Sequence, residues 1–206
     1  MTSMTPSELL ARLFELGAAQ QTVLVAIDGL GGAGKTVLSE QLASGLKSSG
    51  LISQVVHFDD FFLPSSERPH GSVDHKPVGG DFDWVRLHDE VLAQLRRGWA
   101  ARYQVYDWRQ DVLAETQAVA PGGIVIIEGV YSSRRELAPL YDLRVWVECP
   151  RALRLARCLE RDGAESHARW EHDWMPMEDR YVVELSLIHI SEPTRLRRIS
   201  YAVFCL

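Results

Sequence analysis

The chain has 206 residues, of which 46% are hydrophobic and 24% charged, a composition typical of globular proteins that excludes a disordered, collagen-like or disulfide-scaffold protein. Its formal net charge of −6 argues against a main role in holding nucleic acid through phosphates, because that binding needs clustered lysine and arginine. The three cysteines lack metal-ligand spacing, and the chain lacks both a long apolar stretch and a secretory signal, which predicts a cytoplasmic protein without membrane binding.

Strand and helix patterns alternate along the chain. Residues 5–17 predict a helix that begins at Thr5 or Ser7 and ends at Gly17. Continuous apolar runs such as VLVAI and IVIIE predict strands that are buried on both faces of a parallel sheet. The alternation predicts βαβ units and a doubly wound α/β core. The patterns after the first helix cover residues 22–28, 36–50, 52–62, 84–98, 123–130, 143–149 and 150–162.

The first strand pattern runs directly into a glycine-rich loop, GLGGAGKT, which matches GxxxxGK[ST] and is followed by a helix pattern. Glycines allow the backbone to approach phosphates, the N–H groups at the helix start donate to anionic oxygens, Lys35 reaches the β- and γ-phosphates, and the Thr36 hydroxyl binds Mg²⁺. The alternative is a glycine-rich turn with a solvated lysine. The residues predicted to bind ATP are Gly29, Gly31, Gly32, Ala33, Gly34, Lys35, Thr36 and Val37.

Glu128 stands at the carboxyl end of the later strand pattern GIVIIE, where open α/β sheets bind ligands. It is a candidate to hold Mg²⁺ directly or through water, together with Thr36. The alternative is an ordinary acidic residue at a strand end.

The C-terminal residues 185–206 resemble a translated sequencing-library adapter. LSLIHISEPTR and ISYAVFCL correspond to two constant blocks in one reading frame, with residues 196–198 at the position of an index. The alternative is a genuine amphipathic C-terminal segment. We therefore expect one domain, residues 1–184, and we expect that replacing the tail by the natural end raises stability.

Several motifs together identify a family. The glycine loop is followed in order by VVHFDDFF, VDHKP, YQVYDW, IVIIEGVYSS and an arginine-rich segment that ends in LERDG. The chain contains no asparagine, so it cannot form the guanine-reading element of a GTPase. Over residues 22–184 the chain resembles the uridine kinase and phosphoribulokinase family of P-loop kinases. The resemblance implies a P-loop NTPase fold of three α/β/α layers with a mostly parallel central sheet, and a small lid at about residues 161–170.

The resemblance also implies a catalytic base. In the family, the first aspartate of the motif after the second strand faces the acceptor hydroxyl, and this aspartate corresponds to Asp59. The resemblance also makes Asp59 a third candidate Mg²⁺ ligand, beside Thr36 and Glu128. A sugar hydroxyl has a pKa far above 7, so a carboxylate that accepts its proton suits phosphoryl transfer. The alternative for Asp59 and Asp60 is that they cap the turn after the strand.

By resemblance, Asp74 and Tyr106 contact the acceptor. The chain departs from the family pattern here, because a lysine is inserted into the DHP order and the histidine that follows the YDF-like motif is absent. We expect Arg109 to contact a more anionic or differently shaped acceptor, the alternative being a solvated loop arginine. Residues 63–83, too long for a simple connection, are expected to help enclose the acceptor.

Arginines recur on one face of the predicted helix 150–162, where Arg161-Asp162 matches the lid motif of the family. Arginine can hold spread phosphate charge as a lid closes, so Arg161 is a candidate catalytic residue and Arg169 a candidate substrate contact. The alternative is a solvated stripe. The aromatic residues within 169–181 are expected to pack in the core.

We therefore predict an ATP- and Mg²⁺-dependent kinase that phosphorylates a hydroxyl of a nucleoside, uridine- or cytidine-like, or of a related sugar. The alternatives are a kinase of the same fold for pantothenate or glycerate, and an ATP-binding or ATPase module that regulates a partner. The predicted partner is a small-molecule acceptor, with no nucleic acid and no membrane. The acceptor, the preferred nucleotide and a homo-oligomeric state stay open.

Overall fold

The structure is a computed structural model that describes residues 4–191, with the backbone alone for residues 185–191. The tail predicted to be adapter-derived, residues 185–206, therefore lies outside the described residues except for the helix backbone that ends at Ser191. No helix among the described residues has the length and apolar character needed to cross a membrane.

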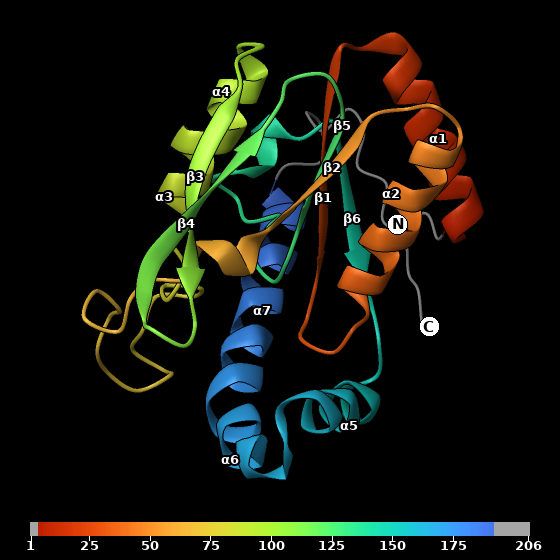
Figure 1. The fold of residues 1–206 in the computed structure, drawn as a ribbon. Coiled ribbons are helices and arrows are strands. Elements are labelled where there is room, and N and C mark those ends of the chain that lie inside the picture. The colour runs from red at the N-terminus through yellow and green to blue at the C-terminus, as the bar shows by residue number, and fades with distance from the viewer. Residues whose placement is uncertain (1–3, 192–206) are drawn as a thin grey trace.

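Four parallel strands form the central sheet in the order β2-β5-β1-β6 (Figure 1). Each pair of neighbours is separated in the sequence, so every connection crosses over, as the predicted doubly wound core requires. The carboxyl ends of the strands share one edge of the sheet, where ligand sites form in such folds. The strands are β1 (Thr22–Gly29), β2 (Ser53–His57), β5 (Gly123–Glu128) and β6 (Leu143–Val147).

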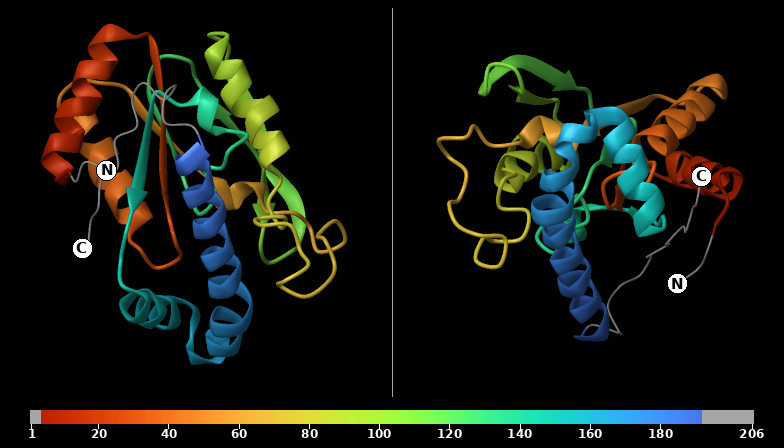
Figure 2. Two further views of the ribbon diagram at one scale, coloured as in Figure 1. Left: turned by 180° about the vertical axis from the view of Figure 1, so that it is seen from behind. Right: turned by 90° about the horizontal axis from the view of Figure 1, so that it is seen from below.

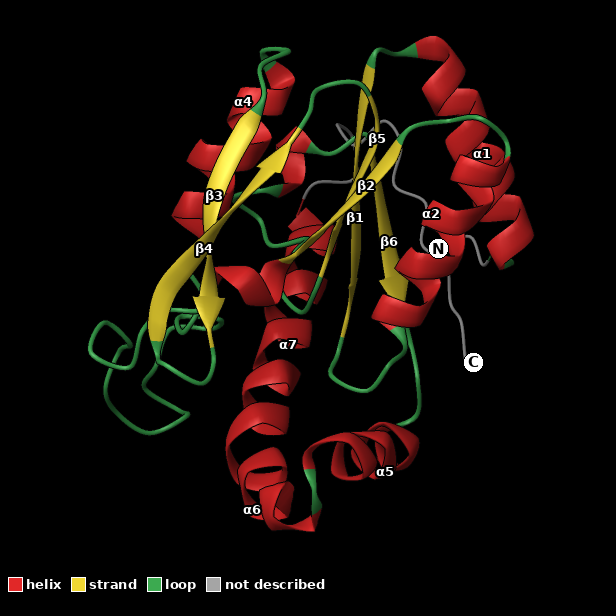
Figure 3. Ribbon diagram, in the orientation of Figure 1, coloured by secondary structure: helices red, strands yellow, loops and turns green. Residues whose placement is uncertain are grey.

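Helices cover both faces of this sheet (Figures 2 and 3). In β1, Val25 and Ile27 pack with α1 and α2, whereas Leu24 packs on the opposite face, and all three are fully buried. This confirms the predicted three-layer α/β/α arrangement. One outer layer contains α1 (Pro6–Ala19) and α2 (Lys35–Ser48); the other contains α3 (Trp84–Arg86), the π-helix η2 (Leu87–Leu92), α4 (Ala93–Arg96) and α7 (Met175–Ser191).

Helix α1 begins as predicted but ends later. Thr5 caps it by accepting the N–H of Glu8, and the Glu8 carboxylate accepts the N–H of Thr5 in return. The prediction that Gly17 ends the helix is wrong, because Gly17 keeps a helical backbone and faces Ile124 and Leu51 in the core.

An antiparallel hairpin, β3 (Ala101–Asp107) and β4 (Val112–Val119), forms a separate two-stranded sheet that the βα alternation did not predict. Most of β4 is exposed, so its sequence lacks the continuous apolar run that marked the central strands. The hairpin packs on the 3-10 helix η1 (Phe58–Phe61), which follows β2.

Short helices lie at the carboxyl edge of the sheet, below the strands in Figure 1. Trp170 and Met175 are buried there against Cys158, which confirms the expected core packing of this aromatic segment. The elements are α5 (Arg151–Asp162), the 3-10 helix η4 (Ala164–Ser166), α6 (His167–Arg169) and the π-helix η5 (Trp170–Trp174); one further 3-10 helix, η3 (Ala138–Leu140), precedes β6.

Candidate active site

The glycine loop, residues 29–36, joins β1 to α2 at the carboxyl edge of the sheet. Gly29 and Gly34 have φ values of 146° and 98°, and a Cβ at Gly29 would collide with the carbonyl oxygen of Val147. Gly34 caps α2 without a side-chain hydrogen bond, so the N–H groups of the first turn have no partner from the cap. Such a helix start favours an anion.

Side chains from the loop and from β5 meet beside it. Lys35 is buried, and its Nζ donates to the Leu30 carbonyl at 3.2 Å. Thr36 Oγ1 donates to Glu128 Oε2 at 2.9 Å, which brings two of the three candidate metal ligands into contact. Val37, the last residue of the predicted ATP-binding set, is half exposed in the first turn of α2.

His57, at the end of β2, adds a titratable group that the sequence patterns had not singled out. Its Nδ1 lies 3.4 Å from Glu128 Oε1, and this hydrogen bond raises the pKa of His57. Burial raises the pKa of Glu128, but hydrogen bonds from His57 and Thr36 and the charge of Lys35 outweigh burial and hold it below its ordinary value. Glu128 is therefore an ionised carboxylate at neutral pH.

Asp59 stands in η1 at the same edge. The residue is exposed as a whole, but the protein around its carboxylate removes part of the water there, which raises the pKa of Asp59. The charges of Lys35 and Arg161 oppose this shift, whereas Glu128 adds to it. Asp60 lies differently, because it accepts the Tyr103 hydroxyl at 3.0 Å from the hairpin.

Arg161 and Arg169, the two arginines of the predicted lid, are exposed. Arg161 donates to both oxygens of Asp162, at 2.6 and 2.9 Å, and its charge reaches Asp59. Arg169 is exposed and lies over the Trp174 ring at 5.3 Å. Arg154 on the same helix as Arg161 is instead buried, so the alternative of a uniformly solvated stripe does not hold.

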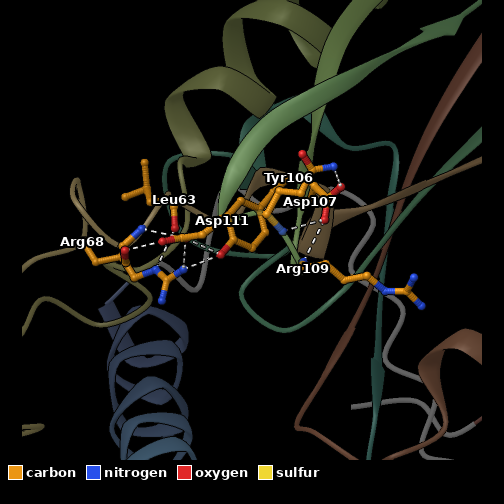
Figure 4. Close-up of polar contacts among 8 residues, drawn as sticks. Leu63, Arg68, Tyr106, Asp107, Arg109 and Asp111 are labelled. Carbon is orange, nitrogen blue, oxygen red and sulfur yellow. Dashed lines mark hydrogen bonds and ion pairs between the residues drawn. The ribbon is translucent and has the colours of Figure 1, made fainter.

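Tyr106 belongs to a polar cluster between the hairpin and the long loop (Figure 4). Its hydroxyl donates to Asp111 Oδ1 at 2.6 Å and accepts from Arg68 Nη2 at 2.6 Å. Arg68 also donates to the Leu63 carbonyl and lies over the Phe62 ring at 4.4 Å. Hydrogen bonds from the Ser65 side chain and from Tyr106 lower the pKa of Asp111 to about 2.

The remaining predicted acceptor residues lie apart from this cluster. Arg109 is exposed, and Figure 4 shows its guanidinium pointing away from Asp111. Asp74 is exposed in the long loop, which Arg180 of α7 holds through the carbonyls of Val73 and Lys76.

Another carboxylate beside the glycine loop, Asp28, was also missed. It is fully buried at the end of β1, where it accepts the N–H groups of Gly29 and Ser133 at 2.7 and 2.8 Å and the Tyr181 hydroxyl at 2.6 Å. Its signal in the sequence was an acidic residue inside an otherwise apolar strand. Two of its three partners, Ser133 and Tyr181, lie more than 100 residues away, and no local pattern names them.

Comparison with known proteins supports the family indicated by the sequence motifs. Residues 24–171 match the model of the "Phosphoribulokinase / Uridine kinase family". A uridine kinase from Staphylococcus haemolyticus is 31% identical over 149 residues, which cover 70% of each chain.

Two solved structures are similar over almost the whole chain. A "putative fructose transport system kinase" from Silicibacter is 26% identical with a TM-score of 0.73, covering 96% of this chain and all of its own. A "Possible Uridine Kinase" from Bacillus stearothermophilus has a TM-score of 0.66 at 23% identity, covers 93% of this chain and 98% of its own, and supports the fold alone.

Proposed function

The chain belongs to the phosphoribulokinase/uridine kinase family of P-loop kinases, and from this premise we propose that it transfers the γ-phosphoryl group of ATP, with Mg²⁺, to a hydroxyl of a nucleoside or a related sugar. One observation carries the proposal: Thr36 and Glu128 are in contact beside Lys35, with the charge of Asp59 coupled to both Lys35 and Glu128. An ammonium, a hydroxyl and two carboxylates at one sheet edge are the groups that phosphoryl transfer uses.

The residues present fit both cofactors. Mg²⁺ prefers oxygen ligands and keeps several waters, so the Thr36 hydroxyl and the Glu128 carboxylate would hold it together with phosphate oxygens. Among the described residues no group of three or more His, Cys, Asp or Glu gathers as a metal site, which suits an ion that depends on the nucleotide. Mg·ATP, when bound, supplies the phosphoryl group and neutralises part of its charge.

The protein side chains then have separate tasks. Lys35 and the N–H groups at the start of α2 bind phosphate oxygens. Asp59 accepts the proton of the acceptor hydroxyl at a carboxylate oxygen, and its raised pKa makes it a better proton acceptor. Arg161 closes over the phosphates and excludes water. We assign acceptor contacts to Tyr106, to Asp74 and to two exposed arginines, Arg109 and Arg169.

A free sugar is a second candidate acceptor. The solved structure described as a fructose transport system kinase is similar over its full length and is 26% identical to this chain. This chain also lacks the histidine that follows the YDF-like motif in nucleoside kinases of the family. In this chain, Asp111 stands in that segment, and Arg68 donates a hydrogen bond to it.

The test is ADP release from Mg·ATP in the presence of uridine, cytidine, fructose, pantothenate or glycerate. Asp59→Asn is expected to lower kcat by about 10²- to 10⁴-fold, the range for a lost general base, while ATP still binds. Turnover with one acceptor identifies the substrate. ADP and inorganic phosphate without any phosphorylated acceptor would overturn the kinase proposal in favour of an ATPase module.

A further inference from the structure

Both backbone polar groups of Gly31, its N–H and its carbonyl, face one buried ion pair. Glu178 Oε1 of α7 accepts the Gly31 N–H at 2.7 Å. Arg154 Nη1 of α5 donates to Glu178 Oε2 at 3.0 Å and lies 3.4 Å from the Gly31 carbonyl. The Arg154 and Glu178 side chains are only 4% and 5% exposed. We call these two side chains the Gly31 clasp.

The loop also fits tightly against the elements that carry the clasp. A Cβ at Gly31 would lie 2.7 Å from the Trp170 ring and 2.9 Å from Glu178 Oε1. A Cβ at Gly32 would collide with the carbonyl oxygen of Arg154. A side chain at either position would therefore collide with η5, α5 or α7.

A buried ion pair is a poor means of gaining stability, because the loss of water around both charges offsets most of their attraction. Two apolar side chains would join α5 to α7 equally well. Arg154 and Glu178 supply something that apolar side chains cannot, which is a directional donor for the Gly31 carbonyl and a directional acceptor for the Gly31 N–H. Burial raises the pKa of Glu178, and the Gly31 N–H, the charge of Lys35 and Arg154 oppose this rise.

We propose that Arg154 and Glu178 are positioning residues that hold Gly31 so that the glycine loop has its phosphate-binding conformation before the nucleotide arrives. The inference rests on the proposed function, because it assumes that the loop binds Mg·ATP. Ordering a loop costs free energy, and a loop that is ordered in advance no longer adds this cost to binding. The clasp therefore increases the affinity for the nucleotide and leaves the affinity for the acceptor unchanged.

Glu178→Gln tests this assignment, because the amide keeps an acceptor for Gly31 but removes the charge that faces Arg154. Its neighbour on α7 offers a matched control. Asp179 pairs with Arg151 at 2.7 Å and so joins the same two helices, but both side chains are about half exposed and neither has a hydrogen bond to the glycine loop. Asp179→Asn thus removes a contact between α5 and α7 without touching Gly31.

The primary measurement is the Kd of Mg·ATP by calorimetry, with the melting temperature measured on the same samples. We expect Glu178→Gln to raise this Kd about tenfold, which corresponds to about 1.4 kcal/mol, and Asp179→Asn to change it less than about twofold. In turnover, Glu178→Gln should raise the KM for ATP and leave the KM for the acceptor unchanged.

An unchanged Kd for Glu178→Gln would overturn the proposal. A lower Kd would overturn it too, because it would mean that the charge of Glu178 only repels phosphate. An equal rise in Kd for Asp179→Asn would overturn it too, since helix docking would then explain both. If Glu178→Gln does not fold, Arg154→Lys keeps a positive charge that faces Glu178 but removes the guanidinium fork that also reaches the Gly31 carbonyl, and it should raise the Kd as well.

The proposed function is judged separately. A wild-type chain that binds Mg·ATP but phosphorylates no acceptor would overturn that function and leave the Kd comparison valid. A wild-type chain that does not bind Mg·ATP would overturn both.

Discussion

Tyr181→Phe removes one oxygen atom from the end of the sheet where β1, the turn after β5 and helix α7 meet. That oxygen is the donor to Asp28 Oδ2 at 2.6 Å, and Asp28 itself is 0% exposed. Burial raises the pKa of Asp28, while the Tyr181 hydroxyl is the strongest of the groups that oppose this rise. The variant therefore leaves a buried carboxyl group with two hydrogen-bond donors, both backbone N–H groups, in place of three.

The loss can be estimated from the chemistry of this contact. Hydrogen bonds to a charged group contribute about 1.5–3 kcal/mol. For a chain of this size, each kcal/mol changes the melting temperature by roughly 2–4 °C, so we expect Tyr181→Phe to melt about 3–12 °C lower. Because Asp28 also accepts the N–H of Gly29, Mg·ATP affinity should weaken in parallel.

Tyr141→Phe is the matched control. The Tyr141 hydroxyl is also buried, but it has no hydrogen-bond partner among the described residues. Removing an unpaired buried hydroxyl should leave stability unchanged or raise it slightly. Urea unfolding followed by circular dichroism compares the two variants. Equal losses of free energy, or a loss below about 0.5 kcal/mol for Tyr181→Phe, would refute the reasoning, since measured hydrogen bonds of this type contribute more.

Three further predictions follow from other parts of the site. Glu128→Gln should lower the pKa of His57 toward 6.5 in an NMR titration, and equal pKa values in both proteins would count against the contact. Because the pKa of His57 is raised in the fold, the contact should stabilise the protein below pH 6.5. This stabilisation should be lost as the pH rises through the folded-state pKa. Arg68→Met should raise the KM for the acceptor about tenfold or more, and Arg109→Ala should raise it by a smaller factor. The reason is that Arg68, unlike Arg109, is held in the Tyr106 cluster by charge-assisted hydrogen bonds. Neither variant should change the KM for ATP. Phe58→Ala should lower the unfolding free energy by about 3–5 kcal/mol in urea, because its ring is fully buried, and a loss below about 1 kcal/mol would contradict the described packing.

The sequence by itself was sufficient for the fold class and the family. Continuous apolar runs, the βα alternation and the glycine loop are local patterns, and each depends on residues within one strand, one helix or one turn. The contact between Thr36 and Glu128 was also within reach, because strand ends of a parallel sheet share one edge. The exposed hairpin was not, since β4 has no continuous apolar run to mark it.

Only the tertiary structure decided which charged residues are buried and with what partners. Arg154 and Arg161 have the same residue type and lie on the same helix, yet one is buried against Glu178 and the other is mostly exposed. Asp28 likewise depends on Ser133 and on a tyrosine 153 residues further along the chain. A periodic pattern reports which face of an element is apolar, whereas the pairing of a buried charge depends on how distant elements pack. The physical reason is that a charge leaves water only where the completed fold supplies its hydrogen-bond partners.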